Sequence, residues 1–339
     1  MSTIKQIAKK AGVSPTTVSN VLNGNTARVS AKTRDKVEII LREENYIPNM
    51  AAHILAHNNS RIVGVIMFME PRRNETVLED PFSSTILGAI EVELRHNGYF
   101  MMLHTTSDQD EVLRLVRAWK LAGLILLWVP STIIPVLKEN ILSPVIFIDS
   151  YVSDDIPSYL SVGLEDKQGG YEIVRYLLSM GHREMVFLAN DSVFPGADYA
   201  RFCGCREALE EEGLTLDEDR FIALSKDRKE RFTLYRRLST RPFPFTAIVF
   251  SADYYAAEAI TFFQEVGVEI PRDLSVTGFD DNIYARLIRP RLTTVHQDVN
   301  RKGQAAVDLL MKSMHEEPLP IPHVRMPVRL KIRESVGRI

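Results

Sequence analysis

The order of apolar and polar residues divides the 339-residue chain into a short helical segment and a longer segment of mixed character. Over residues 1–47, apolar side chains recur three and four positions apart, as on one face of a helix. Beyond residue 61, short apolar runs alternate with longer stretches of helical spacing. The runs that we predict to be strands are 62–68, 99–103, 124–127, 145–148, 185–189, 247–250 and 274–277.

The first two predicted helices carry the signals of a helix-turn-helix. Thr3 and Gln6 have the spacing of a capping box at the start of the first helix. Gly12 can take the positive φ that a tight turn between helices requires. Ser14 can then cap a second helix, with Pro15 at its first position. This second helix carries short polar side chains that can reach base edges in a major groove. They are Thr16, Thr17, Ser19 and Asn20.

Two further helical segments follow before the strand-rich region. Ser30 predicts the start of a third helix. This helix is expected to end at Asn45, shortly before Pro48. Residues 48–56 predict a helix of about two turns, which is too short to be stable alone in water. A segment near its folding threshold can couple two domains, because whatever holds it in place decides whether it is helical.

The longer segment has the pattern of an α/β fold. Alternating strands and helices form parallel sheets with helices on both faces, and the length of this segment suggests two such sheets. Ligands of doubly wound folds bind beyond the carboxyl ends of the strands. We therefore expect a binding site in a cleft between two lobes, formed by polar residues that follow strands.

The net charge of −3 is the sum of two unlike parts. Residues 1–60 hold 8 of the 41 Lys and Arg residues and 4 of the 44 Asp and Glu residues, so they carry +4 and the remainder −7. Clustered positive charge beside a helix-turn-helix is the footprint of a nucleic-acid contact, because neutralised phosphates release counterions.

Several classes of protein are disfavoured by the sequence. No apolar run reaches the ~18 residues of a membrane span, and the first residues lack the apolar stretch of a signal peptide, so we expect a cytoplasmic protein. No glycine-rich phosphate loop or nucleophile motif occurs, so we expect neither an enzyme nor a cofactor. His53 and His57 have the spacing of a metal pair but no third ligand nearby, and Cys203 and Cys205 fit small thiols better than a redox pair, so we expect no metal.

The N-terminal residues resemble the headpiece of the lactose/galactose repressor family, and the resemblance continues through nearly the whole chain. The motifs that carry it are TIKQIA at 3–8, AGVS at 11–14, TVS at 17–19, VLN at 21–23, VS at 29–30, TR at 33–34 and YIPN at 46–49. The resemblance implies a homodimeric transcription regulator that binds a pseudopalindromic operator in double-stranded DNA. It implies base selection by Pro15, Thr16 and Asn20, and a minor-groove wedge at Leu55. The full set of expected DNA contacts is Thr3, Ser14, Pro15, Thr16, Thr17, Ser19, Asn20, Asn23, Ala52, His53 and Leu55.

For the rest of the chain, the resemblance implies a hinge helix and linker at 48–60 and then a bilobed body like a periplasmic binding protein. Three crossovers would connect its lobes, with lobe one at 61–160 and 290–321 and lobe two at 161–289 and 322–339. The expected effector site comprises Phe82, Ser83, Asp149, Arg201, Ala252, Asp253 and Asp280. Phe82 matches an apolar wall, Arg201 an arginine that grips effector oxygens, and Asp280 a carboxylate that accepts hydroxyl or amine donors.

The chain departs from the family pattern where the effector would bind. Ala252 stands where an asparagine is usual, and residues 226–228 (Lys-Asp-Arg) replace an aromatic lid. The loop 70–80 is long and contains Arg72 and Arg73. These departures suggest a carbohydrate-like effector that is larger or more anionic than a plain monosaccharide. Control of the regulator by a protein coregulator is the alternative. An exported binding protein is disfavoured because a basic head would serve no purpose there.

Overall fold

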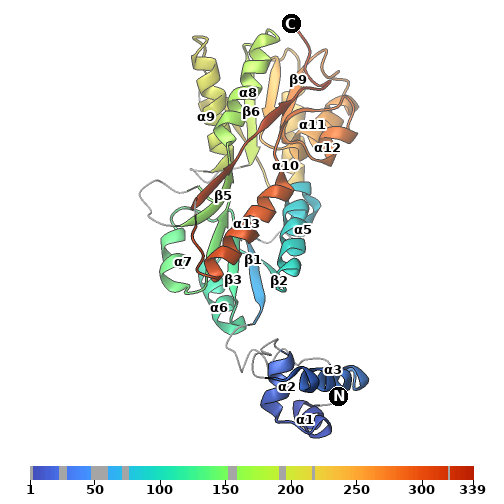
Figure 1. Cartoon of the computed structure of the whole chain (residues 1–339). Coiled ribbons are helices and arrows are strands. Elements are labelled where there is room, and N and C mark those ends of the chain that lie inside the picture. The colour runs from blue at the N-terminus through green and yellow to red at the C-terminus, as the bar shows by residue number, and fades with distance from the viewer. Residues whose placement is uncertain are drawn as a thin grey trace. The chain divides into compact units, whose positions relative to one another are not determined.

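The computed structural model describes residues 3–22, 29–46, 60–70, 76–151, 159–190, 196–215, 218–319 and 321–339. The chain divides into two compact units, Met1–Ser60 and Arg61–Ile339, here called the head and the body (Figure 1). Each unit has its own apolar core. Within the described residues, no helix combines the length and apolar character needed to cross a membrane.

The head contains the three predicted helices around one small core. They are α1 (Ile4–Ala11), α2 (Pro15–Leu22) and α3 (Ala31–Glu43). Ile7 and Val18 are fully buried between α1 and α2, and Val37 of α3 closes the core. The helix-turn-helix prediction is confirmed. The predicted hinge helix at 48–56 lies outside the described residues.

The caps of the head helices are those that the sequence predicts. The Thr3 hydroxyl accepts a hydrogen bond from the Gln6 amide, and the Gln6 side chain accepts one from the Thr3 amide at 2.7 Å. Gly12 ends α1 with a φ of 65°. The Ser14 hydroxyl accepts a hydrogen bond from the Thr17 amide at 3.1 Å, and the Ser30 side chain caps α3. Local signals are therefore sufficient to fix where these helices begin and end.

The first lobe of the body is built on a six-stranded parallel sheet. Its strands are β1 (Ile62–Phe68), β2 (Phe100–Thr106), β3 (Gly123–Leu127), β4 (Val145–Ile148), β5 (Leu160–Leu164) and β11 (His323–Met326), in the spatial order β11-β5-β4-β3-β1-β2. Its helices are the 3-10 turn η2 (Val77–Glu79), α5 (Pro81–His96), α6 (Gln109–Trp119), α7 (Ile134–Asn140) and α13 (Val299–Met314). Helices α5 and α13 pack side by side on one face of the sheet (Figure 1), and α6 and α7 cover the other.

The second lobe repeats this architecture. Its strands are β6 (Met185–Asn190), β7 (Phe221–Leu224), β8 (Ala247–Phe250), β9 (Ser275–Asp280), β10 (Thr293–His296) and β12 (Arg329–Lys331), in the order β12-β10-β9-β8-β6-β7. Its helices are α8 (Asp166–Ser179), α9 (Ala197–Glu210), the 3-10 turn η3 (Glu218–Arg220), α10 (Arg228–Leu238), α11 (Asp253–Glu265) and α12 (Ile283–Leu287). Only β12, at one edge of this sheet, runs antiparallel to its neighbour. The predicted α/β class with two doubly wound sheets is confirmed.

The chain crosses between the two sheets three times, and each crossing lies a few residues beyond the boundary expected from the sequence. The first crossing follows Leu164 and not residue 160, because β5 pairs with β4 and β11 and so still belongs to the first sheet. The second follows His296, because β10 pairs with β9 of the second sheet before the chain reaches α13. The third follows Met326, because β11 still belongs to the first sheet. These short strands mix polar with apolar residues, so the sequence pattern did not reveal them.

Candidate functional site

A cavity of about 380 Å³ lies where the carboxyl ends of the strands of both sheets meet. From the first lobe it is lined by Phe68, Met69, Thr76, Val77, Glu79, Asp80, Phe82, Ser83, Trp128, Val129, Pro130, Asp149 and Tyr151. From the second lobe and the crossover after β10 it is lined by Asn190, Gly196, Ala197, Asp198, Arg201, Lys226, Ala252, Tyr254, Tyr255, Asp280 and Gln297. Its size suits a small polar molecule.

The structure brings most of the predicted effector residues to this cavity. Those that line it are Phe82, Ser83, Asp149, Arg201, Ala252 and Asp280. Asp253 does not, and its assignment is corrected. Its carboxylate is fully buried, accepts hydrogen bonds from the Thr294 hydroxyl at 2.6 Å and from the Asn282 amide at 2.9 Å, and so holds the turn after β9. Burial, reinforced by the neighbouring Asp280, raises the pKa of Asp253 well above its usual value.

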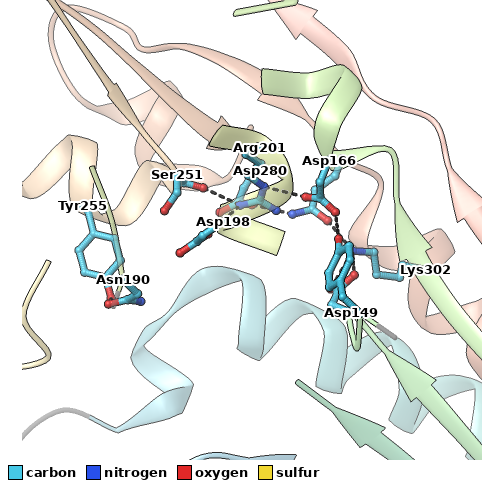
Figure 2. Close-up of polar contacts among 11 residues, drawn as sticks. Asp149, Asp166, Asn190, Asp198, Arg201, Ser251, Tyr255, Asp280 and Lys302 are labelled. Carbon is cyan, nitrogen blue, oxygen red and sulfur yellow. Dashed lines mark hydrogen bonds and ion pairs between the residues drawn. The ribbon is translucent and has the colours of Figure 1, made fainter. Parts of the chain in front are cut away.

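Arg201 is held in the cavity wall by two hydrogen bonds and an ion pair with Asp198 at 3.8 Å (Figure 2), and by contact with an aromatic ring. Its Nε donates to Asp166 Oδ1 at 2.7 Å, and its Nη1 donates to the Ser251 carbonyl oxygen at 2.6 Å. Its guanidinium carbon lies 3.7 Å from the centre of the Phe279 ring. A planar donor group held in this way is preorganised to bind ligand oxygens, because little side-chain entropy is lost on binding.

Asp166, at the start of α8, is the residue that positions Arg201. Burial raises the pKa of Asp166 to about 6, while the charge of Arg201 works in the opposite direction. The second carboxylate oxygen of Asp166 accepts a hydrogen bond from the Tyr151 hydroxyl. Asp166 was not predicted, because an acidic residue in the first turn of a helix is common for reasons of helix polarity alone.

A buried chain of hydrogen bonds joins the two lobes beneath the cavity. Lys302 of α13 donates to both carboxylate oxygens of Asp149 at 2.9 Å and to Gln297 Oε1 at 2.8 Å. Gln297 Nε2 donates in turn to Asp280 Oδ1 at 2.6 Å. Asp149 follows β4 of the first lobe and Asp280 ends β9 of the second, so this polar chain spans the junction (Figure 2). Lys302 was not predicted, although it occupies a position on the apolar face of α13, four residues before Ala306.

Three cavity residues that follow or end strands have left-handed backbones. Trp128 has a φ of 59°, Asp149 of 47° and Asp280 of 118°. Such values are uncommon for residues other than glycine and concentrate at functional sites. Burial raises the pKa of Asp280 to about 7, with Arg201 acting against the rise and Asp80 adding to it.

Aromatic rings form the apolar part of the cavity wall. The Phe82 and Trp128 rings have centroids 6.1 Å apart, and those of Tyr254 and Tyr255 are 5.2 Å apart. Tyr255 also donates a hydrogen bond to Asn190 Oδ1 at 2.9 Å (Figure 2). Only Phe82 was predicted. The position of Trp128 directly after an apolar run was the signal that could have identified it.

The basic residues expected to favour an anionic effector are not all at the cavity. Lys226 lines it. Arg228 instead pairs with Glu258 at 3.5 Å and lies 5.1 Å from the Phe232 ring centre. Arg72 and Arg73 lie outside the described residues. The structure therefore gives the expectation of a more anionic effector less support than the sequence did.

The predicted DNA contacts that the structure describes belong to α1, α2 and the turn between them. Pro15 and Thr16 are exposed at the start of α2, and Asn20 is partly exposed further along the helix. The hydroxyls of Thr3, Ser14 and Thr17 make capping contacts, and Ser19 is partly exposed. Asn23, Ala52, His53 and Leu55 lie outside the described residues. Among the described residues of the head, four exposed lysines form no ion pair: Lys5, Lys9, Lys32 and Lys36.

Comparisons with family models match both units of the chain. Residues 3–49 match the model of bacterial regulatory proteins of the lacI family, and residues 174–336 match a periplasmic binding protein-like domain. The HTH-type transcriptional repressor PurR of Erwinia tasmaniensis is 30% identical over 319 residues, covering 92% of this chain and 90% of that protein. The HTH-type transcriptional regulator MalR of Clostridium butyricum is 30% identical over 344 residues, covering 99% of both.

Solved structures are similar over the same length. A Lac repressor dimer bound to operator and the anti-inducer ONPF matches with a TM-score of 0.84 and 26% identity, covering 99% of both chains. A complex of the transcriptional regulator CelR with cellobiose matches with a TM-score of 0.72 and 23% identity, covering 99% of this chain and 100% of that one. The second likeness concerns the fold alone.

Proposed function

Because the chain belongs to the lacI family of bacterial regulatory proteins, we propose that it is a ligand-controlled transcriptional repressor that binds a pseudopalindromic operator as a homodimer. The observation that carries this proposal is the union, in one chain, of a helix-turn-helix head with a bilobed body that encloses a polar cavity. A regulator acts where the chromosome is accessible, so we place it in the cytoplasm.

The head provides a surface suited to DNA. In this proposal α2 is the recognition helix, with Pro15, Thr16 and Asn20 at base edges. The exposed, unpaired lysines of α1 and α3 supply positive charge for phosphates. Ala52, His53 and Leu55 are assigned to the minor groove in the same proposal.

Exposed apolar side chains on the body support a homodimer. Phe100 is 62% exposed and Leu103 37% exposed on β2, which is an edge strand of the first sheet. In the second lobe, Leu287 of α12 is 66% exposed and the nearby Ile283 50% exposed. Exposed apolar patches favour association, and a two-fold dimer presents two heads to the two halves of a palindromic site.

A small molecule in the cavity is the proposed control signal. The cavity offers fixed hydrogen-bond partners, notably Arg201 and Asp280, beside aromatic walls, which suits a carbohydrate-like effector. Such an enclosed site favours a small molecule over a protein coregulator. Binding between the lobes would change their closure and, through the hinge, the affinity of the heads for DNA. Linkage requires DNA to change effector affinity by the same factor.

Selection of bound DNA from a random pool tests the proposed function. We expect the full chain to enrich a pseudopalindrome, with an affinity that falls about tenfold or more between low and physiological salt. The body alone, Arg61–Ile339, should enrich nothing and serves as the control. Enrichment of the same site by the body, or of no site by the full chain, would contradict the proposal.

Replacement of Arg201 tests whether the cavity is the effector site. A panel of metabolites first identifies compounds that change operator affinity. Arg201→Lys keeps a positive charge beside Asp166 but loses the planar fork, so the effector dissociation constant should rise about tenfold or more. Operator affinity without effector should stay unchanged. Arg206→Lys is the matched control, because Arg206 lies on the same helix in a surface pair with Glu210. An unchanged effector response in the Arg201 variant would place the effector elsewhere.

A further inference from the structure

Carboxylates outnumber cations in the described lining of the interlobe cavity. The acidic lining residues are Glu79, Asp80, Asp149, Asp198 and Asp280, and the basic ones are Arg201 and Lys226. A cavity with this excess of negative charge disfavours ligands that carry phosphate or carboxylate groups, because like charges repel strongly in a partly buried site.

Ion pairs behind the lining leave this imbalance unchanged, because one adds a carboxylate and the other adds a cation. Arg201 forms an ion pair with Asp166 at 2.7 Å, and Lys302, which does not line the cavity, donates hydrogen bonds to both carboxylate oxygens of Asp149. Lys226 is the remaining cation in the described lining, which also contains the carboxylates of Glu79, Asp80 and Asp280, while Asp198 lies 3.8 Å from Arg201. The described lining of the cavity therefore carries unbalanced negative charge.

Asp80 and Asp280 contribute to this charge from different lobes. Asp80 is held as the N-cap of α5, where it accepts hydrogen bonds from the Ser83 amide at 3.0 Å and the Ser83 hydroxyl at 2.7 Å. Asp280 Oδ1 accepts from Gln297, and Oδ2 accepts no hydrogen bond from a described residue. The charge of Asp80 acts against ionisation of Asp280 and raises the pKa of Asp280. A cation between them would remove this repulsion and favour closure of the lobes.

The aromatic walls suit a cation as well. Phe82, Trp128, Tyr254 and Tyr255 line the same cavity. The faces of aromatic rings attract ammonium groups, and this attraction is larger where water is excluded. The rings and the free carboxylate oxygen together form the two parts of a site for an organic amine.

We propose that the effector is a small polyol that carries a protonated amine, and that the ammonium group binds Asp280 at the junction of the two lobes. This inference rests on the proposed function, in which the cavity is the effector site. An ammonium group has three donors and no acceptor, which complements carboxylate oxygens. A neutral polyol can also donate to Asp280, but it leaves the excess charge uncompensated.

The pH dependence of binding separates these cases. The charged groups around Asp280 are Arg201 of α9, Lys302 of α13, Asp80 before α5, Asp253 of α11 and the adjacent Asp281. Since the pKa of Asp280 is raised to about 7, its carboxylate gains charge between pH 5 and pH 8. A primary alkylamine such as D-glucamine stays protonated over this range, so its affinity should increase with pH. The affinity of a neutral polyol should not increase in this way.

Calorimetry and thermal unfolding of the full chain with two matched sets of compounds test the proposal. One set is D-glucamine, D-sorbitol and D-sorbitol 6-phosphate, and the other is D-glucosamine, D-glucose and D-glucose 6-phosphate. In at least one set, at pH 7, where both amines are largely protonated, the amine should bind about tenfold or more tightly than its neutral partner, and the phosphate more weakly than either. For glucamine, the preference should shrink at pH 5.

Asp280→Asn should abolish the preference for the amine while keeping the acceptor for Gln297. Asparagine also tolerates the positive φ at this position. The control is Asp308→Asn, which removes one negative charge from a surface pair with Lys312 on α13. A preference that survives in Asp280→Asn overturns the proposal.

Equal or weaker binding of both amines, including no binding by any of the six compounds, also overturns it. If a neutral or phosphorylated compound binds more tightly than its amine partner, and Arg201→Lys weakens that binding, the proposed amine is wrong while the proposed function stands. The proposed function is tested independently of these compounds by the selection of operator DNA described above.

Discussion

Gly204→Ala is expected to destabilise the second lobe by about 3 kcal/mol or more, at the upper end of the cost of overpacking. A Cβ added at Gly204 would lie 1.8 Å from the carbonyl oxygen of Lys167 and 2.8 Å from the amide nitrogen of Tyr171. These are backbone atoms of α8, which cannot rotate away as a side chain can. Gly170 has the reciprocal relation, since its added Cβ would lie 1.9 Å from the Arg201 carbonyl oxygen. The two helices therefore touch through this pair of glycines.

Urea unfolding of the full chain measures this effect. Gly88→Ala is the matched control, because Gly88 is also helical and an added Cβ there meets nothing within 4 Å. Its expected effect is a gain of up to about 1 kcal/mol from helix propensity. Separation of α8 and α9 to admit the new methyl group would displace Arg201 from Asp166, so effector binding should weaken as well. A variant at Gly204 with unchanged midpoint would mean that the helices do not approach this closely.

The sequence predicts features of the fold that depend on neighbouring residues. The capping residues Thr3 and Ser30 set helix starts in the head, and the apolar runs from 62–68 to 247–250 became strands of two parallel sheets. In both cases the determining interactions lie within a few residues of each other, or follow from burial on both faces of a sheet.

Features that depend on distant pairing could not be predicted in the same way. Strand β10 contains two threonines and a histidine, and it is a strand because β9 and β12 flank it. The family resemblance instead implied that the chain had already returned to the first lobe at residue 290. The point at which the chain crosses between the lobes depends on which strands can form hydrogen bonds with residues 293–296. Those strands, β9 and β12, are other segments of the chain, so the local sequence does not reveal the pairing.

The candidate site shows the same division. The resemblance to a family supplied Arg201 and Asp280, but their partners Asp166, Gln297 and Lys302 emerge only in three dimensions. A residue type that serves helix capping or surface solubility elsewhere becomes a positioning group when the fold buries it. Asp253 was predicted to line the cavity but does not. Its neighbour Ala252 lines the cavity, and proximity in sequence does not decide on which side of the turn a carboxylate lies.

Lys302→Met is expected to lower the free energy of unfolding of the body by about 3–5 kcal/mol, the typical cost of breaking a buried ion pair. The Lys302 side chain is 1% exposed and that of Asp149 is 8% exposed. Methionine fills a similar volume, so the loss comes from the charge that remains. Without Lys302, the carboxylate of Asp149 stays buried without its two hydrogen bonds at 2.9 Å. Gln297 also loses the donor that orients its side chain toward Asp280.

The matched control is Lys312→Met, because Lys312 lies on the same helix and pairs with Asp308 at the surface. Its expected cost is less than about 1 kcal/mol. The double variant Asp149→Asn, Lys302→Met should recover much of the lost stability, since it removes both buried charges, and a double-mutant cycle by urea unfolding measures the coupling. Equal costs for the two lysine variants would mean that Asp149 and Lys302 are solvated, and that the polar chain between β4 and β9 does not hold the lobes together. If Lys302→Met costs more than Lys312→Met, the buried polar chain holds the two lobes together. A ligand group that binds Asp280 is then connected through Gln297 and Lys302 to Asp149 of the first lobe, so its binding can affect how the lobes close.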